Sequence, residues 1–207
     1  NVDIKAMDGI ITANLDNGKL KAKIQNILVQ NIFLMIGQKP LLNGELNGEL
    51  NLDSIDIANL NGKGDIKLEN GVLNAANLKE LTNKEFPQNT TLNAHIKPTF
   101  TNSTVHFASI INSNLATINK FDGSYDINKN SLEALYSADI PSLAQLEFLT
   151  GMKLNGALNP SGKISINESI NATLNSDFIG SKLKIDIKDN KANLNLSTFE
   201  IAKLLEF

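Results

Sequence analysis

The strongest constraint on the fold comes from four turn-forming dipeptides, each joining two segments in which apolar and polar residues alternate. They are Asn17-Gly18, Asn70-Gly71, Lys129-Asn130 and Asp189-Asn190. Asn and Gly tolerate the positive φ angles of a two-residue hairpin turn, so each dipeptide predicts a tight β-hairpin. Because side chains alternate between the two faces of a strand, the turn also predicts which residues face each other.

In the predicted hairpins the apolar residues fall on one face of the sheet, with Val72 as the exception. The expected pairs are Leu15–Leu20, Ala13–Ala22 and Ile11–Ile24; Leu68–Leu73 and Ile66–Ala75; Ile127–Leu132, Tyr125–Ala134 and Phe121–Ala138; and Ile187–Ala192, Ile185–Leu194 and Leu183–Leu196. Mostly Lys, Asp, Glu and Asn occupy the other face. The pattern predicts a mainly β protein, with an antiparallel sheet that is apolar on one side.

A short helix is expected after each hairpin, because capping residues precede apolar runs. The expected helices are residues 27–36, a turn carrying Leu78 and Leu81 after Asn77, residues 143–149 and residues 198–205. Further strands are expected at 45–52 and 54–60. Hairpin and helix thus recur at a spacing of roughly fifty to sixty residues. The chain divides into units of about 1–37, 44–85, 104–151 and 163–207, within one continuous body with a possible internal boundary at 86–89.

Composition excludes several classes of function. The net charge is −3, so nothing favours binding to nucleic acid. The absence of arginine removes bidentate recognition of phosphate, and the absence of cysteine removes disulfides and thiol chemistry. The chain begins without methionine and has no apolar run long enough to span a membrane. We therefore expect a fragment of a larger protein.

Residue types that carry catalysis or bind metal show no useful spacing. His95 and His106 both fall on the polar side of their strands, where surface histidine is the ordinary interpretation, and a metal pair would require neighbouring strands. Asp53, Asp56 and Asp65 lack a calcium-loop pattern. Gly62-Lys63-Gly64 lacks the frame of a phosphate loop. We expect no enzyme activity, no metal and no cofactor.

The apolar face allows two interpretations. It is either the core between two packed sheets, or an open groove that binds an apolar ligand, because soluble monomers rarely expose extended apolar strips. The candidate groove residues are Ile11, Leu15, Leu20, Ile24, Ile66, Leu68, Leu73, Tyr125, Ile127, Leu132, Leu183, Ile185, Ile187, Leu194 and Leu196.

Several stretches resemble a known family. The run from Gly64 to Leu78 is similar to a recurrent strand and short-helix segment of the AsmA-like superfamily of Gram-negative envelope proteins, which includes AsmA, TamB and YhdP. Another pattern of that group is similar to Ala138–Gly151 followed by Leu154–Leu158 and Gly162–Ile164, and the ending from Ala192 to Leu205 is similar as well. Together these stretches cover most of the chain.

The resemblance implies a long curved antiparallel sheet with an apolar groove on its inner face. It also implies a periplasmic protein, anchored to the inner membrane by a segment absent from this chain, that carries phospholipid acyl chains between inner and outer membranes. Partners would be phospholipid and, through other regions, components of both membranes. The alternative is a structural or adhesive β-repeat region with a sealed core and a protein-binding surface.

Overall fold

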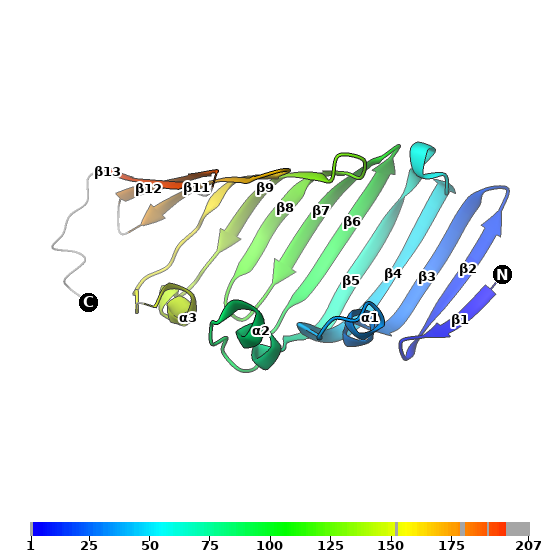
Figure 1. The fold of residues 1–207 in the computed structure, drawn as a ribbon, viewed down its shortest axis with the longest axis horizontal. Coiled ribbons are helices and arrows are strands. Elements are labelled where there is room, and N and C mark those ends of the chain that lie inside the picture. Colours follow the sequence, from blue (N-terminus) through cyan, green and yellow to red (C-terminus); the bar gives the residue numbers. More distant parts are fainter. Residues whose placement is uncertain (1, 152, 179–180, 190, 198–207) are drawn as a thin grey trace.

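The computed structural model describes residues 2–151, 153–178, 181–189 and 191–197. These residues form one open antiparallel sheet of thirteen strands, in which each strand pairs with its neighbours in the sequence. Figure 1 shows the strands side by side along the long axis of the molecule. The expected mainly β class, built from one antiparallel sheet with short helices, is confirmed. The strands are β1 (Val2–Ala6), β2 (Gly9–Asp16), β3 (Lys19–Leu28), β4 (Leu42–Ser54), β5 (Asn61–Leu73), β6 (Asn93–Thr101), β7 (Thr104–Asn112), β8 (Thr117–Asp126), β9 (Ser131–Asp139), β10 (Ser161–Ile166), β11 (Ile170–Phe178), β12 (Ser181–Lys188) and β13 (Lys191–Ser197).

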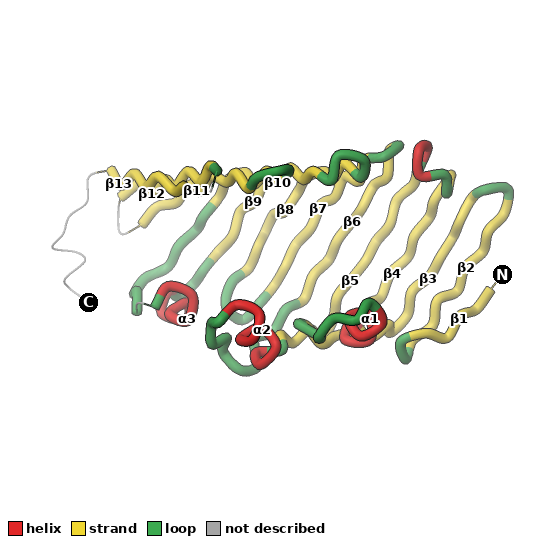
Figure 2. Tube along the Cα trace, viewed as in Figure 1, coloured by secondary structure: helices red, strands yellow, loops and turns green. Residues whose placement is uncertain are grey.

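The helices lie along one edge of the sheet, which we call the helix edge. Neighbouring strands are antiparallel, so successive connections alternate between the two edges. Helices follow β3, β5 and β9, which all run in the same direction, and they therefore reach the same edge (Figure 2). The opposite edge, the turn edge, holds a 3-10 helix, η1, between β4 and β5. The helical elements are α1 (Val29–Met35), η1 (Ile57–Asn59), α2 (Ala75–Thr82), η2 (Leu143–Leu146) and α3 (Glu147–Thr150).

Two of the predicted hairpins have the predicted registers. Asn17-Gly18 joins β2 to β3, with φ angles of 48° and 78° that the two residues tolerate. The last hairpin joins β12 to β13, although Asn190 itself lies outside the described residues. All six predicted pairs are present: Leu15–Leu20, Ala13–Ala22, Ile11–Ile24, Ile187–Ala192, Ile185–Leu194 and Leu183–Leu196.

The predicted hairpin at Asn70-Gly71 is wrong. β5 passes through this dipeptide without a turn. The two residues together oppose Gly44 of β4, and Asn70 has a φ of 53°, so the dipeptide forms a β-bulge. The expected pairs are absent because β5 pairs with β4 on one side and with β6 on the other. The cross-strand rows are Leu46–Leu68–Ala94 and Gly48–Ile66–Ile96.

The bulge explains why the predicted face was still right for Leu68 and Leu73. These residues are an odd number of positions apart and would face opposite sides of a regular strand. The extra residue in the bulge restores them to the same side, where Leu73 pairs with Leu42. Ala75 cannot pair with Ile66, because Ala75 begins α2.

The hairpin between β8 and β9 is confirmed, but its predicted register is wrong by two residues. Leu132 faces Tyr125 rather than Ile127, because the turn spans residues 127–130. The carboxylate of Asp126 accepts the backbone N–H groups of Asn128 and Lys129, both at 3.0 Å, which stabilises the longer turn. A shift of two residues leaves every side chain on its predicted face.

The predicted helices match α1, α2 and the pair η2–α3, with differences at their ends. The side chain of Asn74 caps α2 by accepting the N–H of Asn77 at 3.1 Å, so the expected capping role of Asn77 is wrong. Asn26, which precedes the helix expected at 27–36, does not cap it, because α1 begins at Val29 and Asn26 lies with a φ of 55° at a bulge in β3. The helix expected at 198–205 lies outside the described residues.

Two connections also differ from simple strand patterns. The strand expected at 54–60 is wrong, because η1 occupies this stretch and Asp56 caps it by accepting the N–H of Ala58 at 3.1 Å. Residues 86–89 lie in the connection between α2 and β6. β5 and β6 pair with each other across this connection, so the sheet is continuous there.

Candidate functional site

One side of the sheet carries apolar side chains from every strand, and we call it the apolar face. A single row of facing residues shows its continuity, because it crosses all thirteen strands without a charged or hydrogen-bonding side chain. The row consists of Val2, Ala13, Ala22, Leu50, Gly64, Pro98, Phe107, Gly123, Ala134, Ile164, Ala172, Ile187 and Ala192.

The structure brings the sequence-predicted groove residues together on this face. Ile127 is the exception, since it follows the end of β8 and lies in the turn. The others lie in strands on the apolar face: Ile11, Leu15, Leu20, Ile24, Ile66, Leu68, Leu73, Tyr125, Leu132, Leu183, Ile185, Ile187, Leu194 and Leu196.

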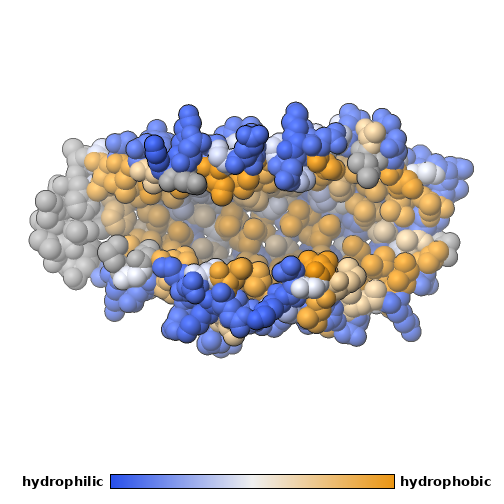
Figure 3. All heavy atoms as spheres, in the orientation of Figure 1, coloured by the Kyte–Doolittle hydropathy of each residue, from blue (hydrophilic) through white to orange (hydrophobic). Residues whose placement is uncertain are grey.

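The described chain does not cover the apolar face with a second layer. Its buried hydrophobic residues are few and are Ile27, Val29, Leu52, Ala75, Ala134 and Leu143. Several of these lie in or beside the helices, so the helices protect the helix edge only. Leu15 and Leu194 on the apolar face remain 59% and 64% exposed. Figure 3 shows an apolar band along the molecule, bordered above and below by hydrophilic residues.

The opposite face of the sheet is polar and carries both histidines. His95 lies 2.8 Å from an oxygen of Asp65, and both side chains are partly exposed. His106 faces Thr99, four residues from His95 along β6, so the two histidines are separated by about 13 Å along the strand direction. Within the described ranges, no group of three or more His, Asp or Glu side chains could hold a metal ion.

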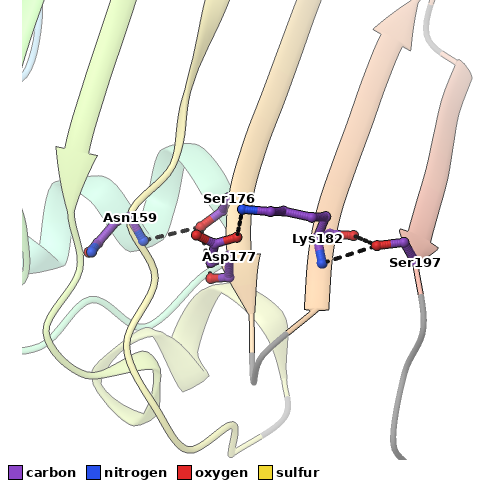
Figure 4. Close-up of polar contacts among 5 residues, drawn as sticks. All are labelled: Asn159, Ser176, Asp177, Lys182 and Ser197. Atoms are coloured by element: carbon purple, nitrogen blue, oxygen red, sulfur yellow. Dashed lines mark hydrogen bonds and ion pairs between the residues drawn. The ribbon is translucent and has the colours of Figure 1, made fainter.

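Polar contacts near the helix edge join the last strands to one another (Figure 4). The hydroxyl of Ser176 accepts the N–H of Asn159 at 3.2 Å and donates to the carbonyl of Asp177 at 3.1 Å. Asp177 forms an ion pair with Lys182 on the facing strand, and the hydroxyl of Ser197 accepts the N–H of Lys182 at 3.3 Å. The Ser176 hydroxyl contacts backbone groups rather than a base, so this cluster orders strand ends and is not arranged for nucleophilic catalysis.

Tyr136 bridges three strands on the apolar face. Its hydroxyl donates to the carbonyl oxygen of Thr173 on β11 at 3.0 Å, passing over β10. Position 162 on β10 is glycine, and a Cβ there would lie 3.1 Å from the Tyr136 ring. Burial raises the pKa of the Tyr136 hydroxyl, so it stays a hydrogen-bond donor at neutral pH. The Thr173 hydroxyl accepts the Lys163 N–H at 3.0 Å, which completes the local pairing of β10 with β11.

The carboxylates with shifted pKa values lie at the two edges of the sheet. The side chain of Asn59 lowers the pKa of Asp56 by hydrogen bonding, Lys79 does the same for Glu85, and the backbone N–H of Lys129 lowers the pKa of Asp126. These groups stabilise turns and loops. The apolar face itself carries no carboxylate or amine within the described strands.

The predicted list of groove residues left out most of the aromatic residues of the apolar face. Phe100, Phe107 and Tyr136 lie on this face, whereas only Tyr125 was placed among the groove residues. The alternation around β6 and β7 was visible in the sequence. Their turn at Asn102-Ser103 lacks an Asn-Gly signal, so no register could be assigned to them.

Comparison with known proteins gives no relative: the chain matches no family model, no curated protein and no solved structure. None of the helices in the described part is long and apolar enough to cross a membrane.

Proposed function

We propose that this chain is a segment of a periplasmic lipid-transfer protein, whose apolar face carries the acyl chains of phospholipids between the inner and outer membranes. The observation that supports this most is the apolar row across all thirteen strands, left uncovered by the described residues. A soluble protein rarely exposes such a strip unless something binds it. The resemblance to the AsmA-like superfamily supports the same proposal.

The size of the apolar face suits acyl chains. Neighbouring strands lie about 4.8 Å apart, so the thirteen strands extend for roughly 58 Å along the sheet. On one strand, side chains of the same face are about 6.7 Å apart, so Leu132, Ala134, Tyr136 and Ala138 of β9 cover roughly 20 Å. A long acyl chain therefore fits either along or across this face.

Binding needs no charged clamp. Burial of a methylene group contributes about 0.8 kcal/mol, so covering half of a sixteen-carbon chain contributes about 6 kcal/mol before the cost of ordering it. The attraction is not directional. An acyl chain can therefore move from one strand to the next without breaking a specific bond, while the charged head group stays in water beyond the hydrophilic borders seen in Figure 3.

Native mass spectrometry of the protein, purified without detergent, tests this proposal. We expect bound phospholipid, identified after extraction, and its loss in the variants Leu194→Asp and Leu68→Asp. Asn193→Asp is the matched control, because it adds the same charge one residue away, on the polar face of β13. Circular dichroism establishes that each variant is folded.

The outcomes separate lipid binding from the structural alternative. Phospholipid lost in Leu194→Asp and retained in Asn193→Asp supports the apolar face as the binding site. A folded wild-type protein that carries no lipid and takes up none from phospholipid vesicles would overturn the proposal. A structural role would then require that another layer of protein seals the apolar face.

A further inference from the structure

The aromatic residues of the apolar face are concentrated on the four middle strands. We call Phe100, Phe107, Phe121, Tyr125 and Tyr136 the aromatic patch, which lies on β6 to β9. In the described residues of the other strands, the apolar face has a single aromatic residue, Phe178 at the end of β11. Aliphatic residues therefore flank the patch on both sides.

Three rings of the aromatic patch, those of Phe107, Phe121 and Tyr136, are held in place before anything binds. The ring centroids of Phe107 and Phe121 are 5.5 Å apart, a distance typical of packed aromatic pairs. Tyr136 lies directly opposite Phe121, and its hydroxyl is fixed by the bond to Thr173. All of these rings are partly exposed, so the patch is both ordered and accessible.

Glycines on neighbouring strands lie opposite several of these rings. Three rings each face a glycine, in the pairs Phe100–Gly62, Phe107–Gly123 and Tyr136–Gly162. A ring can lie over the bare backbone of a glycine, where a larger residue would push it away. The Tyr136 ring shows this directly, because a Cβ at Gly162 would lie 3.1 Å from it.

We propose that the aromatic patch is where a bound acyl chain is held most tightly, an inference that rests on the proposed lipid-transfer function. An aromatic ring buries a large apolar area but has only two side-chain torsions to order. Because fixed rings have little side-chain freedom left, binding a lipid here costs less conformational entropy than binding it over the flexible aliphatic residues on either side. Lipid stays longest over β6 to β9 and moves faster along the flanking strands.

Tyrosine fluorescence tests this inference directly. The chain has no tryptophan and two tyrosines, Tyr125 and Tyr136, both in the patch. A phosphatidylglycerol with a dibrominated acyl chain should quench them when it binds. When excess vesicles of unlabelled phospholipid are then added, the recovery of tyrosine fluorescence gives the dissociation rate of the brominated lipid. We expect Phe121→Leu to raise this rate about fivefold, as lost aromatic contact predicts. Phe178→Leu, the same change on the same face outside the patch, should leave it unchanged.

The outcomes distinguish this inference from the proposed function. If lipid binds the wild type but both variants raise its dissociation rate equally, the special role of the patch is wrong and the proposed function stands. If the wild type shows neither quenching nor bound lipid by mass spectrometry, both proposals fail. Phe107→Leu is a second test of the patch, should Phe121→Leu prove unfolded by circular dichroism.

Discussion

Gly162 of β10 should tolerate no side chain, and alanine at this position gives a sharp test of the sheet packing. A Cβ at Gly162 would lie 1.8 Å from the carbonyl oxygen of Thr173 and 3.1 Å from the Tyr136 ring. The oxygen is backbone, so the clash is relieved only if β10 and β11 separate. The movement would also strain the hydrogen bond from the Tyr136 hydroxyl to Thr173.

The expected cost of Gly162→Ala is about 3 kcal/mol in the free energy of unfolding. Forcing extra atoms into a packed site typically costs about 1–3 kcal/mol. Loss of the Tyr136 hydrogen bond adds about 1 kcal/mol. Alanine restricts the unfolded chain more than glycine does, which offsets roughly 0.4–1 kcal/mol of this cost. Tyr136→Phe isolates the hydrogen-bond part and should cost about 1 kcal/mol alone.

Gly64→Ala is the matched control, because Gly64 lies on the same apolar face of β5. Its Cβ would meet Glu49 and Pro98 at 3.1 Å, contacts that shifts of a few tenths of an ångström relieve. We expect a change within about 1 kcal/mol, of either sign. Urea unfolding followed by circular dichroism gives the free energies, and hydrogen exchange of β10 and β11 locates the effect. Equal stabilities for the two alanine variants would refute the packing described around Gly162.

Two further predictions concern a bulge and a turn. Asn70 has a positive φ, so Asn70→Ala should lower the free energy of unfolding by about 1 kcal/mol, while Asn70→Gly should leave it nearly unchanged. Urea unfolding of the two variants measures both changes. Equal losses of stability would contradict the left-handed conformation of Asn70. Backbone N–H bonds, that of Lys129 first, hold the pKa of Asp126 below its usual 3.8, so the folded state favours the carboxylate. Its contribution to stability should be present above pH 3.8 and lost as the pH falls through the lowered pKa. A titration of Asp126 by NMR should give a midpoint below that of an unfolded peptide, and an unshifted midpoint would refute the turn geometry.

The dipeptide Asn-Gly illustrates what the sequence could and could not predict. Asn17-Gly18 forms the expected two-residue turn, whereas Asn70-Gly71 forms a bulge inside β5. Both conformations need a positive φ at the asparagine, so the asparagine alone does not distinguish them. The residues that follow the dipeptide make the difference. Because Asn74 caps α2, only Val72 and Leu73 remain after Asn70-Gly71, which is too short for the second strand of a hairpin. A prediction that weighed this cap first would have continued β5 through the dipeptide.

The faces of the sheet were easier to predict than its registers. Which side a residue occupies depends on alternation within its own strand, so Leu132 was placed on the correct face although its partner was wrong. Predicting the aromatic patch would have required knowing which strands are neighbours and in which register they pair. Phe107 and Phe121 meet only because β7 and β8 are neighbours in a particular register, and neither strand end carries a turn signal that sets it.

The bulges also bear on which occupant the apolar face suits. β3 is irregular at Asn26, β5 at Asn70-Gly71, and β8 between Ile118 and Lys120, so the pleat changes near the helix edge on several strands. A second protein sheet packed face to face would need side chains that match each irregularity, because sheets pack by interdigitation. An acyl chain has no register and bends at every carbon, so it adapts to such a surface. Under the proposed function, the same irregularities are therefore accommodated by the flexibility of the acyl chain.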